Sequence, residues 1–294
     1  MRTIATALLL SVLAVPASAQ RVAVAGDSAT DEFRGTDNRC GTSIYRDTTK
    51  NWLELLVDLR HLDVGIWGTY SEPRRRGYSQ NWARSGAVSA DVNSRGQAVG
   101  VASQSPDVAL LMVGSNDINP AYKDYPRRLY YNTLSASSRA YWINQIVSAH
   151  TRAITTMRST GATAWMATIG KYPQPHPSYQ NPAGLARIAL AVSEMNAKLV
   201  AAAPVYGYSV LDLNAFETWL MARGTATAPL LSGQPLLVGG RTIVLGASCN
   251  PVNLLLNDGH GGTVLNGLLA SYIAEVTGIT TPLSDAEIVA AAGL

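Results

Sequence analysis

Strand-like and helix-like segments alternate along almost the whole chain, and this order constrains the fold more than any other feature. Apolar runs typical of buried strands lie at residues 22–26, 63–68, 107–114, 163–170 and 208–213, and apolar residues recur at helical spacing in 50–61, 140–159 and 185–203. Strands that alternate with helices imply crossover connections, and therefore a parallel sheet with helices on both faces. We predict one α/β domain, with a small hairpin formed by residues 234–240 and 241–247.

The first 20 residues have the pattern of a secretory signal peptide. Arg2 precedes an apolar run at residues 5–15, and the small residues Ala17, Ser18 and Ala19 follow Pro16. Pro16 ends the apolar run well short of the roughly 20 residues that span a bilayer. We therefore expect cleavage at or near Ala19, a single mature domain at residues 21–294 that is secreted or periplasmic, and no later segment that is long and apolar enough to span a bilayer.

The composition suits a globular protein that does not bind nucleic acid. Hydrophobic residues make up 47% of the chain, which is ample for a core, and the formal net charge is +3. A nucleic-acid-binding domain would carry a concentrated basic face, which this sequence lacks. The expected partners are instead small molecules or carbohydrates.

Two polar turns follow predicted strands, at the edge of the sheet where ligands bind in this fold class. The first strand stops at Gly26-Asp27-Ser28, and the turn Gly114-Ser115-Asn116-Asp117 follows the strand at 109–113. Gly, Asp and Ser are ordinary turn residues, so the first turn alone does not identify a site. A serine hydroxyl at such a turn becomes a useful nucleophile only with a base and with donors for the developing oxyanion.

The chain has four histidines from which to choose a base. His61 ends a predicted helix, His150 lies within one, and His176 belongs to a proline-rich loop. His260 lies in a glycine-rich turn that opens the last helix, a placement that holds its side chain at the sheet edge. We therefore predict that His260 is the base.

Three groups are candidate oxyanion donors. Gly86 lies in a turn where the missing side chain lets its backbone N–H approach a substrate oxygen. Asn116 offers a neutral side-chain amide, and the Ser28 N–H is the third donor.

These motifs together resemble the SGNH/GDSL hydrolase family. The blocks are GDS at 26–28, NWARSGA at 81–87, GSND at 114–117 and a final Asp/His block, and the resemblance extends from Arg21 to Ile273. It implies a flavodoxin-like three-layer α/β/α sandwich and an ester hydrolase that needs neither cofactor nor metal. The family roles fall on Ser28 as nucleophile, Gly86 and Asn116 in the oxyanion hole, and His260 as base.

One position departs from the family pattern. The family usually has an Asp three residues before the His, where this chain has Asn257, and Asp258 is only two residues before His260. A contracted turn would let Asp258 reach His260; alternatively Asn257 or a backbone carbonyl accepts the Nδ1 hydrogen bond. We favour Asp258, because a carboxylate also stabilises the imidazolium electrostatically.

The two cysteines predict a disulfide between the loops around the site. Cys40 follows Ser28 by 12 residues and Cys249 precedes His260 by 11 in a chain expected to reach an oxidising compartment. Such a bridge would tether the loop after the serine to the loop before the histidine. Two separate buried thiols are the alternative.

The sequence says less about the substrate. Tyrosines and arginines in the loop at 119–135 are expected at the rim of the site, although an exposed loop explains them equally well. Without a long apolar lid, we predict short acyl esters or acetylated carbohydrate. A non-catalytic secreted ligand- or carbohydrate-binding protein on the same scaffold is the alternative, because the usual Asp is absent. A metal-dependent phosphoesterase is disfavoured by the lack of His-x-His and HExxH motifs.

Overall fold

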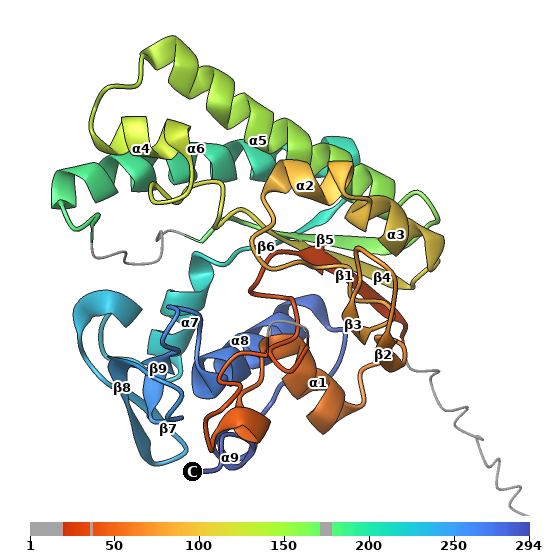
Figure 1. The fold of residues 1–294 in the computed structure, drawn as a ribbon, viewed down its shortest axis with the longest axis vertical. Helices are drawn as coiled ribbons and strands as arrows, with labels where there is room; N and C mark the ends of the chain where they lie inside the picture. The colour runs from red at the N-terminus through yellow and green to blue at the C-terminus, as the bar shows by residue number, and fades with distance from the viewer. Residues whose placement is uncertain (1–19, 36–37, 171–177) are drawn as a thin grey trace, which may run out of the picture.

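The computed structural model describes residues 20–35, 38–170 and 178–294. The predicted signal peptide, except for Gln20, and His176 lie outside these ranges. Figure 1 shows a central sheet between two groups of helices, with α7 and the strands β7–β9 on the lower left of the view.

The central sheet is parallel, as predicted. It consists of β1 (Val22–Gly26), β4 (Val108–Met112), β5 (Thr163–Ala167) and β6 (Ser209–Leu211), in the spatial order β1-β4-β5-β6. Every neighbouring pair is parallel. Strands β1 and β4 are buried along their whole length, which explains why both read as continuous apolar runs rather than as alternating patterns.

Helices cover both faces of this sheet. Val22 and Val24 of β1 belong to one core cluster, with apolar residues of the helices α1, α7, α8 and α9, whereas Ala23 and Ala25 belong to a second cluster on the opposite face. The first layer is α1 (Trp52–Arg60), α7 (Ala215–Ala222), α8 (Thr263–Thr277) and α9 (Asp285–Ala291). The second is α2 (Ser89–Ser94), α3 (Gln97–Ser103), α4 (Asp124–Tyr130), α5 (Ala136–Met157) and α6 (Pro182–Tyr206) (Figure 1). This arrangement confirms the three-layer α/β/α sandwich.

Polar caps explain where several helices begin. Asn51 and Glu54 form a capping box at α1, Ser135 accepts from the Ser138 N–H at α5, and Asn181 caps α6 just before Pro182. The caps start α5 and α6 a few residues earlier than the apolar periodicity indicated. Two short 3-10 helices, η1 (Arg46–Thr48) and η2 (Leu230–Ser232), lie in connecting segments.

Two small sheets flank the central one. β7 (Leu236–Val238) and β8 (Arg241–Ala247) form the predicted antiparallel hairpin, and β9 (Asn253–Leu255) pairs parallel with β8. β2 (Trp67–Thr69) pairs antiparallel with β3 (Arg76–Tyr78).

The prediction of a strand at residues 63–68 was wrong for most of these residues. Only Trp67 and Gly68 belong to a strand, β2, and that strand lies outside the central sheet. Asp63 makes a single bridge to Arg21, and its side chain accepts a hydrogen bond from the Gly65 N–H at 3.0 Å. This Asx turn bends the chain away before a longer strand can form.

Helix α6 is long and apolar enough to meet the length and composition of a membrane span, so the expectation that no later segment would do so was wrong. Core helices meet the same criterion. Ile188, Val192, Met195 and Leu199 of α6 are buried in the cluster beneath the second helical layer.

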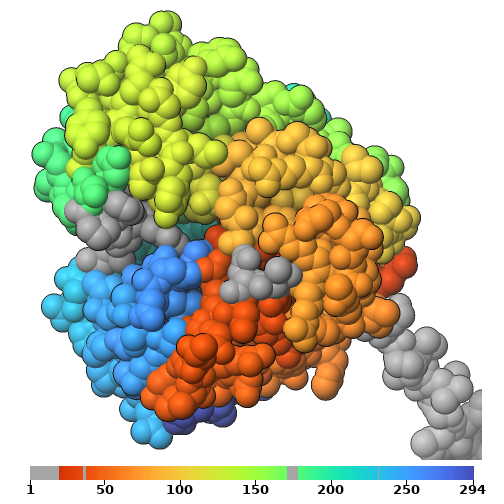
Figure 2. Space-filling model, viewed as in Figure 1, coloured from red at the N-terminus to blue at the C-terminus, as the bar shows by residue number. Residues whose placement is uncertain are grey.

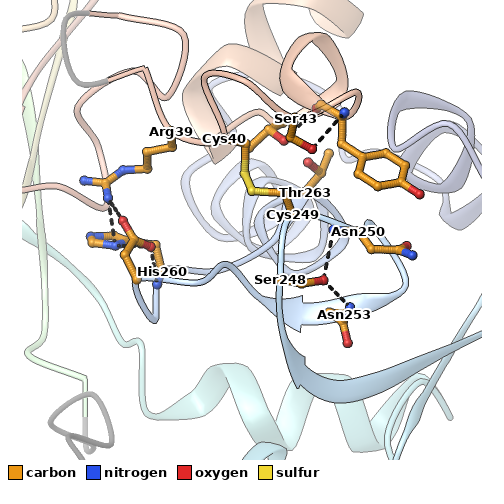
Figure 3. Close-up of a disulfide and its surroundings, with 12 residues drawn as sticks. Arg39, Cys40, Ser43, Ser248, Cys249, Asn250, Asn253, His260 and Thr263 are labelled. Carbon is orange, nitrogen blue, oxygen red and sulfur yellow. Dashed lines mark hydrogen bonds and ion pairs between the residues drawn. A yellow bond between two sulfur atoms is a disulfide. The ribbon is translucent and has the colours of Figure 1, made fainter.

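The predicted disulfide joins Cys40 and Cys249, whose Cα atoms are 5.8 Å apart. It links the long loop after β1 to the segment between β8 and β9 (Figure 3). The alternative of two separate thiols was therefore wrong.

Candidate active site

The first strand delivers Ser28 to a tight turn at the edge of the sheet. A side chain at Gly26 would collide with the Met112 carbonyl of β4, so only glycine lets the two strands remain this close here. After Gly26, the Asp27 carbonyl accepts from the N–H groups of Thr30 and Asp31, at 3.1 and 3.0 Å. This turn holds Ser28 at its start.

Ser28 lines a cavity of about 380 Å³ at the carboxyl ends of β1 and β4. All five residues singled out from the sequence line the same cavity: Ser28, Gly86, Asn116, Asp258 and His260. Figure 2 shows the surface hollowed where the yellow-green helical layer meets the blue C-terminal segment. Residues far apart in sequence therefore meet in one place, as the parallel topology predicts.

His260 faces the serine hydroxyl. Its Nε2 lies 2.6 Å from Ser28 Oγ, and the Phe33 ring packs edge-on against the imidazole at a centroid separation of 6.2 Å. The turn is narrow, because the Leu256 N–H donates to the His260 carbonyl at 2.7 Å and the Gly259 N–H donates to the Leu256 carbonyl at 2.9 Å. This geometry suits proton transfer between the hydroxyl and the ring.

The narrow turn also places Asp258 on the other side of the imidazole. Its Oδ1 lies 3.0 Å from His260 Nδ1 and accepts a hydrogen bond from the His260 backbone N–H at 3.2 Å. Partial burial raises the pKa of Asp258, but the hydrogen bond to His260 and the charges of His260 and Arg39 outweigh it and hold that pKa well below its ordinary value. The carboxylate is therefore ionised at neutral pH.

Asn257, at the position of the usual family Asp, is exposed. Within the described ranges its side chain forms no hydrogen bond. The contracted turn thus brings Asp258, rather than Asn257, to the imidazole.

Candidate oxyanion donors line the same cavity as His260. Among the described residues, neither the Ser28 N–H nor the Gly86 N–H donates to another protein group. Gly86 has φ of +78°, a conformation that glycine adopts without strain, and the space where a side chain would lie is open. Asn116 Nδ2 donates one hydrogen to the Ala87 carbonyl at 3.0 Å and keeps a second for a ligand.

Two buried carboxyl groups support the turns that carry the site. Asp27 accepts from Ser115 Oγ at 2.7 Å and from the Ala29 N–H at 3.0 Å, and burial raises its pKa. Asp117 likewise accepts from the Ser89 N–H and hydroxyl, at 2.8 and 2.9 Å, and burial raises the pKa of Asp117. These bonds tie the β4 turn to the β1 turn and to α2.

The other described histidines lie away from the reacting atoms. His61 caps α1 in a left-handed conformation and is exposed. His150 is buried in α5, where its ring nitrogens lie 2.9 Å from the Ile146 carbonyl and 3.1 Å from the Val113 carbonyl. Both positions are structural. Within residues 20–35, 38–170 and 178–294, no group of three or more His, Cys, Asp or Glu side chains is placed to hold a metal ion.

The expectation that residues 119–135 form one loop was partly wrong, because helix α4 (Asp124–Tyr130) lies within this segment, and only residues before the helix reach the cavity. Asn119, Tyr122 and Lys123 line the cavity. Tyr130 is instead buried, and its hydroxyl accepts from the Asn181 N–H at 2.7 Å, while Arg127 donates to the Pro120 carbonyl at 3.1 Å.

Arg39, Ser85 and Ser115 also line the cavity, and sequence reasoning gave none of them a role. A signal was available for each: Ser85 and Ser115 lie within the NWARSGA and GSND blocks, and Arg39 precedes a cysteine expected beside the site.

Comparison with known proteins agrees with this arrangement of motifs. A family model described as GDSL-like lipase/acylhydrolase matches residues 22–227. No curated protein matches the chain.

Solved structures similar to the chain include three hydrolases. A catalytic mutant of an acetylxylan esterase from Geobacillus stearothermophilus has a TM-score of 0.48 and 17% identity, covering 89% of this chain and 95% of that one. An α/β hydrolase from the metagenome of Lake Arreo has a TM-score of 0.46 and 16% identity, covering 90% and 97%. A phospholipase A1 from Streptomyces albidoflavus has a TM-score of 0.44 and 16% identity, covering 68% and 82%.

Proposed function

The chain belongs to the family of GDSL-like lipases and acylhydrolases and is a hydrolase of ester bonds, and we propose that it works as a secreted serine esterase with Ser28 as nucleophile. The observation that carries this proposal is the 2.6 Å contact between Ser28 Oγ and His260 Nε2, with Asp258 on the opposite ring nitrogen. An ordinary turn serine needs no such partner.

The first half of the reaction forms an acyl-enzyme. His260 Nε2 takes the hydroxyl proton as Ser28 Oγ attacks the ester carbonyl carbon, and the carbonyl oxygen becomes an oxyanion. The N–H groups of Ser28 and Gly86 and the Asn116 amide donate to that oxyanion. As the tetrahedral intermediate collapses, the bond to the alcohol oxygen breaks, and His260 gives its proton to the departing alcohol.

Hydrolysis of the acyl-enzyme repeats these steps with water. His260 removes a proton from water, whose oxygen attacks the acyl carbon, and then returns the proton to Ser28 Oγ as the carboxylic acid leaves. Asp258 accepts the Nδ1 hydrogen throughout and stabilises the imidazolium formed in each half.

The cavity favours small, polar esters. Its lining includes the amide of Asn119, the hydroxyl of Tyr122 and the ammonium of Lys123. We therefore propose short acyl esters, including acetyl groups on carbohydrate, as substrates, since sugar hydroxyls find hydrogen-bond partners among such side chains.

Secretion is part of the proposal. The pattern of residues 1–20 is that of a signal peptide, and a disulfide between Cys40 and Cys249 suits an oxidising compartment. The argument for a non-catalytic binding protein was the missing Asp at position 257. It loses its force because Asp258 takes the place beside His260.

The test is hydrolysis of p-nitrophenyl acetate, butyrate and octanoate by the mature protein, beside Ser28→Ala and the exposed control Ser159→Ala. We expect kcat to fall by at least about 10³-fold in Ser28→Ala and to remain unchanged in Ser159→Ala. A serine-directed phosphonate should label the wild-type peptide that contains Ser28. A rate that survives Ser28→Ala would refute the nucleophile, and a rate that rises toward octanoate would refute the short-chain preference.

A further inference from the structure

Arg39 is a largely buried cation beside the catalytic residues, with only 11% of its side chain exposed. Its Nη1 donates to Asp258 Oδ2 and lies 3.0 Å from His260 Nδ1, and its Nη2 donates to Ser85 Oγ at 3.0 Å. Figure 3 shows the side chain extending from the loop that carries Cys40 toward His260. The guanidinium thus touches Asp258 and His260, and among the described residues it forms no hydrogen bond with Ser28.

The two oxygens of Asp258 have different partners. Oδ2 accepts from Arg39, while Oδ1 lies on His260 Nδ1. The Asp258 side chain is 45% exposed, so without Arg39 only the turn and His260 would keep the carboxylate from rotating toward solvent. A charge-assisted bond to a guanidinium adds orientation as well as energy. Arg39 therefore stabilises the rotamer in which Oδ1 points at the imidazole.

Arg39 is itself held on two sides. Its backbone N–H donates to the Phe33 carbonyl at 2.9 Å, and its guanidinium carbon lies 5.2 Å from the centroid of the Phe33 ring. The next residue, Cys40, is bonded to Cys249. These restraints keep the guanidinium at the site in the free enzyme, which is what a pre-organised site requires.

The position of Asp258 matters for the tautomer of His260. Arginine has only donors, so it binds Nδ1 only when that nitrogen lacks a proton. The neutral ring would then carry its proton on Nε2, facing Ser28, and would be unable to accept the hydroxyl proton. Arg39 Nη1 lies beside both Nδ1 and Asp258 Oδ2, and its hydrogen bond goes to the charged Oδ2. Oδ1 then accepts the Nδ1 hydrogen, which leaves Nε2 free as the base.

We propose that Arg39 is a positioning residue that acts through Asp258 to keep His260 in its base tautomer. The inference rests on the proposed function of Ser28 and His260. Arg39 also compensates for the shortened Asp-x-His spacing. The contracted turn leaves the Asp258 carboxylate at the surface, and Arg39 holds this carboxylate in place from a loop that is distant in sequence.

The test is a double-mutant cycle on hydrolysis of p-nitrophenyl acetate. We expect Arg39→Gln to lower kcat by about 10- to 100-fold with KM within about twofold, since a small misplacement of a catalytic group costs this much. Asp258→Ala should lower kcat at least as far, and Arg39→Gln should cost nothing more in that background. Arg39→Lys, which keeps the charge, should recover part of the rate, and the exposed Arg46→Gln is the matched control.

Additive losses in the cycle would overturn the proposal, because Arg39 would then act independently of Asp258. An unchanged kcat in Arg39→Gln would overturn it as well. If Arg39→Gln does not fold, Arg39→Lys replaces it: its effect on kcat should disappear in the Asp258→Ala background. Retention of activity by Ser28→Ala is a separate outcome, which would refute the proposed function itself.

Discussion

Removal of the disulfide should destabilise the protein substantially, since the bond closes most of the chain into one loop. Cys40 and Cys249 are 209 residues apart in sequence. In the chain-entropy model, a crosslink lowers the entropy of the unfolded state by about 2.1 + 1.5R ln n cal/mol/K, which for a loop of this length is about 5 kcal/mol at 25 °C. We expect Cys40→Ser/Cys249→Ser to lose about 3 to 5 kcal/mol of unfolding free energy.

Urea denaturation followed by tryptophan fluorescence measures this loss. The double variant should unfold at a lower urea midpoint, and its m-value should rise because the unfolded chain without the crosslink exposes more surface. Wild-type protein reduced with dithiothreitol should give the same curve as the double variant. This comparison separates loss of the crosslink from any local effect of the serines.

A loss below about 1 kcal/mol, with the wild-type bond shown to be intact by thiol titration, would refute the reasoning. The crosslink would then barely restrict the unfolded chain. A large loss with an unchanged m-value would instead place the destabilisation in the native packing around Cys40 and contradict the entropic account.

Three further predictions concern the site and its supports. Asn116→Ala should lower kcat by about 10²- to 10³-fold with little change in KM, as measured by ester kinetics, because it removes a proposed oxyanion donor. Gly26→Ala should cost about 1 to 3 kcal/mol in urea unfolding, since the new methyl group meets the Met112 carbonyl; an unchanged midpoint would contradict this. Burial raises the pKa of Glu32 from 4.5 to about 8. Because the native state binds this proton more tightly than the unfolded state, the stabilisation is complete below pH 4.5 and disappears as the pH rises through 8. Glu32→Gln should therefore raise Tm relative to wild type more at pH 8 than at pH 5, and a difference that is independent of pH would refute the assignment.

The secondary structure was predicted best where burial alone decides the pattern. β1 and β4 are buried on both faces, so their sequences are uniformly apolar and end at polar turns. Residues 63–68 also contain apolar residues bounded by turn residues, but the Asx turn at Asp63 prevents a long strand there. A short apolar run does not by itself show with which strand it will pair, or whether it forms a strand at all.

The sequence by itself determined the family, the α/β class and the identity of the nucleophile and base candidates, because these depend on local motifs and on the order of elements. It also left Asp258 and Asn257 as competing neighbours of His260. Only the tertiary structure decided between them, through the hydrogen bonds that narrow the turn at residues 256–260. The position of Arg39 beside the site could be seen only in the tertiary structure. Its contact with Asp258 joins residues 219 positions apart in sequence, and no local sequence pattern shows which side chains of distant loops will meet.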